Sequence, residues 1–400
     1  MKSNLKRYKK PSLITYFFTS IIFKIFSKFK FNLKVIKNDV KKVKGPFVIL
    51  ANHESALDFV NIYTAIKRRA HFVISRAFYS TLPIRKIMDS MGVIPKNQFQ
   101  TIPSDLKNMK TAITNGFPLV IYPAGLMPED GIGTPIPKAT GKALKWIGVD
   151  VYVAKSVGSY LTNPKWSSRW RKGRVKLSIT KFLSKEELLN TLENEVQQKL
   201  EKELYFDAYK NNEIERVCFK HGDEVLGLEN VLYKCPNCKS EFTIKAENKN
   251  TLKCCKCNYS VYADKMGFLY SKDNNVAIYK HPSDWSKFIE NELLLQIKED
   301  KNYTLQCDAD VYMIDYKKGK FVCAGKTNLK LSRKGFEFDG IINNEKFVKN
   351  ISISNFPTLP LKPGKSFEIQ DGKDIYRILP MDKTVCTKWV SALEILYNLN

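Results

Sequence analysis

The pattern of apolar and polar positions divides the chain into stretches of different kinds. Between residues 46 and 182, short apolar runs alternate with stretches whose apolar residues recur at helical spacing. Strands are predicted at residues 47–51, 71–75, 93–94, 119–122 and 151–154. Helices are predicted at residues 59–66, 105–115 and 138–147. Strands that alternate with helices indicate an α/β fold, in which helices flank the sheet.

The remainder of the chain follows other patterns. A charged helical stretch is predicted at residues 184–216, and a further helix is predicted at residues 283–298. From Tyr303 onward, short strand-like runs are separated by polar turns, and residues 384–399 have apolar positions near one face of a helix. These features predict a β-rich C-terminal domain that is capped by a helix. In pattern alone, this arrangement is similar to pleckstrin-homology-like modules.

The N-terminal segment combines strong positive charge with one apolar run. The first 44 residues hold 13 Lys and Arg and one acid, Asp39, and the run at residues 13–26 is interrupted by Lys24. This run is too short for a spanning helix, which needs about 20 apolar residues, and the residues that follow it make a poor signal-peptide cleavage site. We expect a helix in the membrane interface, whose lysines face lipid phosphates. The alternative is an amphipathic helix packed on its own domain.

The charge of the whole chain favours an anionic partner. Its net charge of +26 is carried mostly by the first half, and a hydrophobic content of 44% excludes wholesale disorder. A basic and aromatic stretch at residues 165–176 fits a membrane contact, single-stranded nucleic acid or packed tryptophans. We expect a cytoplasmic protein that is peripheral or monotopic on an anionic membrane surface.

His53 is distinguished among the four histidines because it follows a predicted strand and has an acid nearby. Residues 52–58 read NHESALD. Loops at strand ends place ligands and catalytic groups in α/β folds. A neutral imidazole can take a proton from a hydroxyl, and the carboxylate of Asp58 is spaced to hold the ring. Because Ser55 and Asp58 also have the spacing of a helix cap, this segment alone leaves both interpretations open.

The motif Asn-His-x4-Asp after a strand resembles the first motif of the glycerolipid acyltransferase family. Further segments have that family's order and spacing: GVIPK at 92–96, VIYPAG at 120–125 and VYVA at 151–154. The resemblance covers about residues 10–180 and implies an acyltransferase-type mixed sheet flanked by helices. It implies that His53 deprotonates the acceptor hydroxyl and that Asp58 orients His53. The alkoxide would then attack the thioester of acyl-CoA or acyl carrier protein.

The same resemblance implies a lysophospholipid acceptor, such as 1-acylglycerol-3-phosphate. The residues expected to bind substrate are Asn52, Arg76, Lys96, Pro123, Gly125 and Lys138. The third motif departs from the family's Pro-Glu-Gly-Thr-Arg, because Ala124 replaces the Glu and Leu126-Met127 replace Thr-Arg. Arg76, Lys96 and Lys138 are the candidate replacements for the missing Arg. The alternative is a catalytically degenerate protein of this fold that binds lipid or nucleic acid as an adaptor.

Four cysteines in the second half have the spacing of a zinc ribbon. Cys235, Cys238, Cys254 and Cys257 form the pattern C-x2-C-x15-C-x2-C. Four thiolates suit tetrahedral Zn²⁺, and a site closed by four cysteines is structural. The alternative of two disulfides conflicts with a reducing compartment. The small charge excess of residues 234–257 argues against binding to nucleic acid.

These patterns together predict five segments along the chain. They are a membrane-anchoring segment (1–44), an acyltransferase α/β domain (45–183), a helical connector (184–230), a zinc ribbon (231–270) and a β-rich, pleckstrin-homology-like module (271–400).

Overall fold

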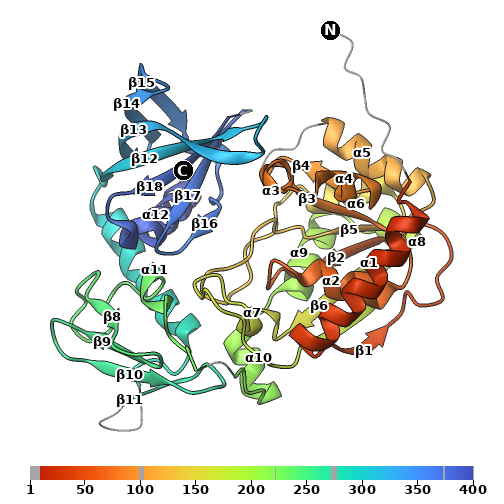
Figure 1. The fold of residues 1–400 in the computed structure, drawn as a ribbon, viewed down its shortest axis with the longest axis horizontal. Coiled ribbons are helices and arrows are strands. Elements are labelled where there is room, and N and C mark those ends of the chain that lie inside the picture. Colours follow the sequence, from red (N-terminus) through yellow and green to blue (C-terminus); the bar gives the residue numbers. More distant parts are fainter. Residues whose placement is uncertain (1–9, 99–102, 221, 272–276, 373, 400) are drawn as a thin grey trace. The chain divides into compact units, whose positions relative to one another are not determined.

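The structure is a computed structural model that describes residues 10–98, 103–220, 222–271, 277–372 and 374–399. The chain forms two compact units (Figure 1). The first unit comprises Met1–Pro128, Ile132–Thr162 and Lys172–Val217. The second unit comprises Glu129–Gly131, Asn163–Arg171 and Cys218–Asn400.

The first unit is built on a mixed seven-stranded sheet, in the order β1-β7-β6-β2-β5-β3-β4. β2 is parallel to its neighbours β5 and β6, whereas β6 and β7 are antiparallel. The strands are β1 (Lys34–Asn38), β2 (Val48–Ala51), β3 (His71–Ser75), β4 (Ile94–Lys96), β5 (Leu119–Ile121), β6 (Val151–Val157) and β7 (Lys176–Leu183). This mixed sheet confirms the fold class that the sequence predicts for this part of the chain.

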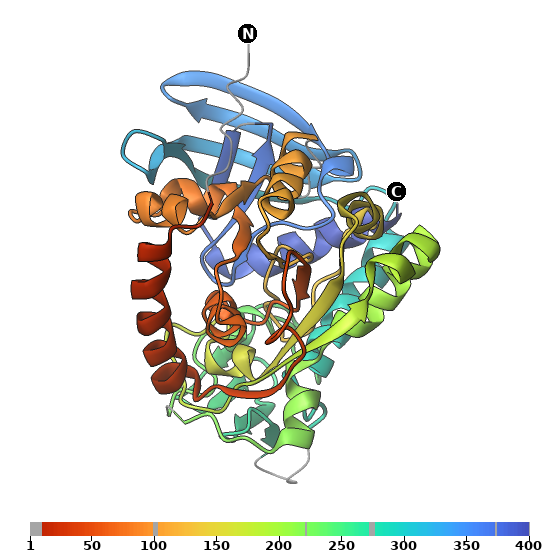
Figure 2. The same ribbon diagram turned by 90° about the vertical axis from the view of Figure 1, so that its right-hand side faces the viewer.

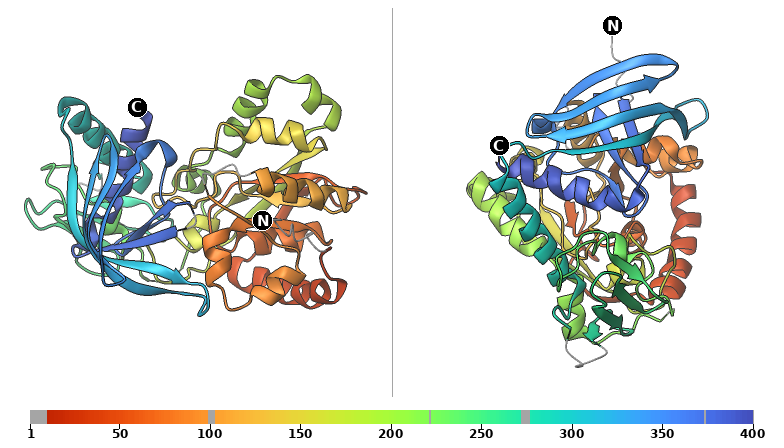
Figure 3. Two further views of the ribbon diagram at one scale, coloured as in Figure 1. Left: turned by 90° about the horizontal axis from the view of Figure 1, so that it is seen from above. Right: turned by 90° about the vertical axis from the view of Figure 1, so that its left-hand side faces the viewer.

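Helices cover both faces of this sheet (Figure 3, left). Alternate residues of β2 enter different cores: Ile49 packs on one face with Ile62 of α2, and Leu50 packs on the other with Leu144 of α6. This division follows from the alternation of side chains along a strand. The helices after α1 are α2 (Asp58–Ile66), α3 (Arg76–Thr81), α4 (Arg85–Ser90), α5 (Pro103–Thr114), α6 (Thr140–Ile147), α7 (Ser159–Thr162), α8 (Lys185–Asn190), α9 (Glu193–Leu204) and α10 (Ala208–Glu215).

α1 (Leu13–Phe26) packs on α2 with one side only. The hydroxyls of Thr19 and Tyr63 lie 2.7 Å apart, and the rings of Tyr16 and Phe23 contact the ring of Tyr63. A π-helical turn (Ser27–Phe31) then leads into β1. The apolar side chains on the other side of α1 are exposed: Leu13, Ile14, Phe17, Phe18, Ile21, Ile22 and Ile25. No helix within the described residues is long and apolar enough to span a bilayer.

The second unit contains two antiparallel sheets. The smaller has the order β11-β10-β9-β8 and consists of β8 (Ile244–Ala246), β9 (Thr251–Cys254), β10 (Ser260–Ala263) and β11 (Leu269–Ser271). α11 (Pro282–Glu299) follows. The larger sheet has the order β15-β14-β13-β12-β18-β17-β16, and its strands are β12 (Leu305–Asp315), β13 (Lys320–Ser332), β14 (Gly335–Ile342), β15 (Glu345–Ser352), β16 (Leu361–Lys362), β17 (Ser366–Asp371) and β18 (Asp374–Pro380).

The C-terminal helix α12 (Cys386–Leu399) completes the core of the larger sheet. Trp389, Leu393 and Leu396 are buried there, and the Trp389 ring stacks on Phe367 of β17. These are the residues that the helical spacing places near one face. A β-rich C-terminal domain that ends in a helix is therefore confirmed.

Two side chains of the basic and aromatic stretch lie inside the second unit. Trp166 is 7% exposed and Arg171 is 4% exposed. The guanidinium of Arg171 lies over the Trp166 ring and donates hydrogen bonds to the backbone carbonyls of Asp223 and Glu224. Of the three interpretations of this stretch, a packed structural role describes these two residues.

Candidate active site and metal centre

His53 lies on the loop that joins β2 to α2. The parallel strands β2, β3, β4, β5 and β6 all point their carboxyl ends toward the same edge of the sheet. Because ligands of α/β sheets bind beyond this edge, loops from all five strands can contribute to one site. The imidazole of His53 is half-buried there, with 19% of its side chain exposed.

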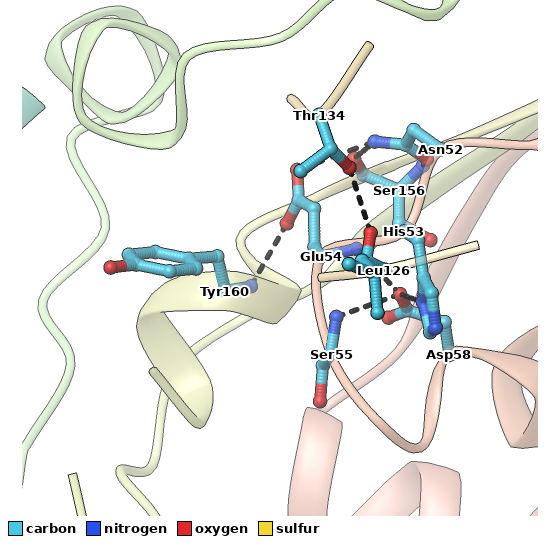
Figure 4. Close-up of polar contacts among 9 residues, drawn as sticks. All are labelled: Asn52, His53, Glu54, Ser55, Asp58, Leu126, Thr134, Ser156 and Tyr160. Carbon is cyan, nitrogen blue, oxygen red and sulfur yellow. Dashed lines mark hydrogen bonds and ion pairs between the residues drawn. The ribbon is translucent and has the colours of Figure 1, made fainter. Parts of the chain in front are cut away.

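Asp58, the first residue of α2, joins the histidine to the backbone of its own loop (Figure 4). Its Oδ2 lies 3.2 Å from Nδ1 of His53 and accepts hydrogen bonds from the backbone N–H groups of Glu54 (2.7 Å) and Ser55 (2.8 Å). The same oxygen therefore contacts the histidine and the loop before α2, whereas the N-cap residue of α2 is Leu57 and forms no side-chain capping bond. Since a carboxylate only accepts, Nδ1 of a neutral His53 carries the proton and Nε2 presents its lone pair.

Tyr122, directly after β5, packs against the histidine. The ring centroids of His53 and Tyr122 are 4.5 Å apart with the planes inclined by 33°. Burial, and after it the charge of Asp58, raise the pKa of Tyr122 well above its usual value, so the phenol keeps its proton. Sequence reasoning did not single out Tyr122, although the position after the β5 strand marks it as a site residue.

Asn52 fastens the start of the loop to β6. Its Oδ1 accepts from the backbone N–H of Ser156, and its Nδ2 donates to the carbonyl of the same residue, both at 2.8 Å. The amide of Asn52 thus bonds to the protein's own backbone (Figure 4). Its assignment as a substrate ligand stays a prediction.

Arg76 and Lys96 come together at the ends of β3 and β4, which are paired strands. Arg76 forms an ion pair with the buried Asp105 (3.1 Å) and donates to the side chain of Asn97 (2.7 Å). Lys96 donates to the backbone carbonyl of Asn97, and burial lowers its pKa while Asp105 opposes that change. Neighbouring strands are about 4.8 Å apart, and β5 lies between β2 and β3, so β3 lies about 10 Å from β2. The distance between these two strands suits a substrate group that is remote from His53. Sequence reasoning did not single out Asp105.

Pro123 and Gly125 form the turn that follows β5. Gly125 has a φ of 71°, in the left-handed region that favours glycine. The Gln98 side chain donates to the carbonyl of Gly125 at 2.8 Å and so holds this turn. Lys138 lies exposed on the loop before α6. The structure shows no bound substrate, so the substrate roles of these residues remain predictions.

Comparison with known families identifies this part of the chain. Residues 32–147 match the family model described as Acyltransferase. This region is an acyltransferase domain. The match extends from the segment before β1 to the end of α6 and includes His53, Asp58 and Tyr122. The family resemblance drawn from the sequence motifs is therefore confirmed.

The chain also resembles a solved structure. This is the crystal structure of the 1-acyl-sn-glycerophosphate (LPA) acyltransferase PlsC from Thermotoga maritima, with 17% sequence identity and a TM-score of 0.41. The similarity covers 50% of this chain and 78% of that one. A comparison with curated proteins gives no significant match.

The second unit gathers the four predicted metal ligands. The sulfur atoms of Cys235, Cys238, Cys254 and Cys257 all lie within 4.8 Å of one another. Sγ of Cys235 is 3.6 Å from that of Cys257, and Sγ of Cys238 is 3.7 Å from that of Cys254. These distances exceed that of a disulfide, and the cysteines are free. With Zn–S bonds of about 2.3 Å, the edge of a tetrahedron of sulfur atoms is about 3.8 Å, so the cluster fits a tetrahedral metal ion.

The local backbone explains why the sulfur atoms converge. Each Cys-x2-Cys pair is followed by a residue in the left-handed region, Lys239 (φ 58°) and Asn258 (φ 62°). The N–H of each of these residues donates to the carbonyl of the first cysteine of its pair, Cys235 or Cys254. The two turns therefore have the same form, and each directs two thiols toward the other pair.

The cysteine cluster is tied to the helices of its unit. The Trp285 indole of α11 donates to the carbonyl of Lys234, just before Cys235, at 2.8 Å. Lys388 of α12 and Lys234 both form ion pairs with Glu241, which lies between the two cysteine pairs. Order at the cluster is thus coupled to the packing of α11 and α12.

Proposed function

We propose that this protein transfers a fatty acyl group from an acyl thioester to the hydroxyl of a lysophospholipid at a membrane surface. The family match supports acyl transfer in general. The observation that supports the chemistry is the pair formed by His53 and the buried Asp58. 1-Acylglycerol-3-phosphate is the acceptor that the motifs favour, and acyl-CoA or acyl carrier protein supplies the thioester.

The geometry suits general base catalysis by His53. Nε2 takes the proton of the acceptor hydroxyl, while Asp58 stabilises the imidazolium that forms at Nδ1. The alkoxide oxygen attacks the thioester carbonyl, a new C–O bond forms, and the C–S bond breaks. The imidazolium then returns its proton to the departing thiolate. Acid–base assistance of this kind contributes about 10²–10⁴-fold in rate.

Arg76 is the cation that we assign to the acceptor phosphate. The third motif offers Leu126 and Met127 where the family has Thr and Arg. In contrast, the side chain of Arg76 is 45% exposed and its guanidinium is oriented by Asp105 and Asn97. A guanidinium held in this way retains donors for a phosphate.

α1 and its neighbours supply the apolar surface for membrane docking. The exposed side of α1 carries Phe17, Phe18 and Ile22, each about three-fifths exposed, and Lys24, Lys28 and Lys30 follow at its C-terminal end. Figures 2 and 3 show α1 along one edge of the first unit, with α3 and α4 beside its N-terminal end. The N–H of Ser12 donates to the carbonyl of Ser90, which fixes this arrangement. Exposed Phe78, Ile84 and Ile87 extend the apolar surface there.

Incubation with acyl-CoA or acyl carrier protein thioester and a panel of lysolipids tests this function. Acyl transfer is followed by mass spectrometry, with His53→Ala and Asp58→Asn alongside. Transfer that both substitutions abolish, without loss of thermal stability, supports the proposal and names the acceptor. Binding to lipid with no transfer, or transfer that His53→Ala leaves intact, would replace it with the degenerate adaptor.

We also propose that the four cysteines hold a structural Zn²⁺. The tetrahedral spacing of the sulfur atoms supports this ion, and four protein ligands leave no open position for catalysis. Metal analysis of the purified protein should give one zinc per chain. Co²⁺ substitution should give the absorption bands of a tetrahedral thiolate site, and Cys254→Ser should remove them. Octahedral Co²⁺ bands, or stoichiometric zinc in Cys254→Ser, would contradict the assignment.

A further inference from the structure

Glu54 is a buried acid that the proposed chemistry does not use. It is 1% exposed, although it lies on the loop between His53 and Asp58. Its Oε2 accepts the backbone N–H of Tyr160 at 3.0 Å, and the N–H groups of Gly158 and Ser159 also donate to its carboxyl. Its Oε1 lies 3.4 Å from the Nδ2 of Asn52. A carboxyl group placed in this way bridges the catalytic loop and the start of α7.

This bridge and Asn52 hold the loop on both sides of the histidine. Asn52 binds the backbone of Ser156 in β6, and Glu54 binds the backbone immediately beyond β6. His53 lies between these two attachments, and its ring is held by Asp58. The backbone position of His53 is therefore set by its two neighbours in sequence, while the orientation of its ring is set by Asp58 (Figure 4).

We infer that Glu54 is a positioning residue for acyl transfer, which fastens the His53 loop to the start of α7 through its carboxyl group. This inference rests on the proposed function and adds a residue that acts only through the position of His53. Glu54 contacts no reacting atom. It acts by fixing the distance between Nε2 of His53 and the acceptor hydroxyl, a distance on which the rate depends steeply.

The charge state follows from what surrounds the carboxyl group. Burial, and after it the negative charge of Asp58, raise the pKa of Glu54 to about 8, although the backbone hydrogen bonds lower it. Asp58 is the ionisable group whose charge acts on Glu54, His53 contacts Asp58, and Tyr122 packs on His53. At neutral pH, this raised pKa favours the protonated form of Glu54, and Asp58 is the carboxylate that contacts the imidazole. Above pH 8, two adjacent carboxylates repel each other and loosen the loop.

Two substitutions separate the role of the Glu54 carboxyl group as a hydrogen-bond acceptor from the role of its charge. Glu54→Gln keeps an oxygen that accepts from α7 and stays neutral at every pH. Glu54→Leu keeps the bulk and removes the acceptor, which leaves backbone N–H groups at the start of α7 without their partner. Glu186→Gln, the same change at an exposed position of α8, is the matched control.

Kinetics as a function of pH give the first measurement. We expect Glu54→Gln to retain kcat within about threefold at pH 7, and Glu54→Leu to lose about 10²-fold in kcat with KM little changed. The wild-type kcat should fall above about pH 8, and Glu54→Gln should not show this fall. Unchanged kcat in Glu54→Leu, or the same alkaline limb in Glu54→Gln, would overturn the proposal. The comparison of the alkaline limbs of the wild type and Glu54→Gln tests the proposal even where Glu54→Leu fails to fold.

A second readout does not depend on the acceptor. In protein labelled with ¹⁵N-histidine, the resonance of Nδ1 of His53 reports its hydrogen bond to Asp58, and His53→Ala assigns it. This signal should persist in Glu54→Gln and Glu186→Gln, and weaken or shift in Glu54→Leu. If no acceptor is acylated by the wild type, the proposed function fails, whereas this resonance still decides whether Glu54 positions His53. An unaltered resonance in Glu54→Leu would refute the positioning role.

Discussion

The proposed membrane docking by α1 is open to a quantitative test. Phe17, Phe18 and Ile22 lie on the side of α1 that turns away from α2, and they are 59%, 60% and 59% exposed. We change all three to Ser. The substitutions leave Tyr16 and Phe23, which pack on Tyr63, in place. We therefore expect the fold to survive and the affinity for lipid to fall.

The expected loss can be calculated from the exposed fractions. Full burial of a Phe or Ile side chain contributes about 1.5–3 kcal/mol. About three-fifths of each side chain remains to be buried, so each insertion contributes roughly 1 kcal/mol at the lower end of that range. Three substitutions should cost roughly 3 kcal/mol of binding free energy, which corresponds to about a hundredfold weaker partitioning.

The assay is sedimentation with sucrose-loaded vesicles that contain about one-quarter anionic lipid. The matched control changes three exposed apolar residues elsewhere in the first unit, Leu189, Leu192 and Ile214, to Ser. These side chains are 49%, 67% and 82% exposed, so a general effect of surface hydrophobicity would appear in the control as well. Equal partitioning of the α1 variant and the wild type, with folding intact, would refute the reasoning.

Three further predictions concern the catalytic pair, the cysteine cluster and the stability of the first unit. Asp58→Asn should lower kcat by about 10³–10⁴-fold with little change in KM, as steady-state kinetics would show; a loss below tenfold would exclude the orienting role. Removal of metal by a chelator should speed hydrogen exchange in β8–β11 and at the start of α11, through the Trp285 bond to Lys234, but not in β2; unchanged exchange in β8–β11 would refute a structural metal. Because the folded pKa of Glu54 is about 8 and the unfolded value is 4.5, the contribution of its proton is complete below pH 4.5 and is lost as pH rises to 8. Denaturant unfolding should therefore show a decline of up to about 5 kcal/mol in the wild type relative to Glu54→Gln, and parallel curves would contradict it.

Some regular elements of the first unit are predicted from a simple periodicity, whereas β7, α3, α4 and α7 are not. The run at residues 71–75 is β3, and the helical stretch at 59–66 is α2 with one added residue, Asp58. β1 was not predicted, because its residues lie in a basic segment. Val35 and Ile36 are 41% and 52% exposed, so this strand does not show the buried alternation that a central strand would show.

In residues 184–216, the many charged side chains obscured the apolar positions that are buried in the fold. Their many charged residues indicated a connector, but Val196, Leu200 and Leu204 of α9 are buried with Leu144 of α6. Their spacing of four residues is a narrow helical stripe, which the surrounding Glu and Lys obscured. Only the tertiary contact with α6 shows that this stripe belongs to the core of the first unit.

In the candidate site, sequence reasoning found groups that act through local spacing. His53 and Asp58 are five residues apart, and the cysteines form two short pairs. Partners from distant parts of the chain were not found: Tyr122 for His53, Asp105 for Arg76 and Ser156 for Asn52. These contacts depend on which elements are neighbours in the folded sheet. The periodicity of a single sequence does not give the order of the strands.

The amide of Asn52 also defines where the catalytic loop can move. Its two bonds to Ser156 follow the backbone bond between the N–H of Asn52 and the carbonyl of Ala154, so they act as one more rung between β2 and β6. The side-chain amide of Asn52 thus forms the hydrogen bonds that a backbone peptide group would form. Any movement of the His53 loop must therefore begin after residue 52, and it must also break the bond of Glu54 to the start of α7. The amide of Ser156 should exchange with solvent as slowly as an amide in the middle of the sheet.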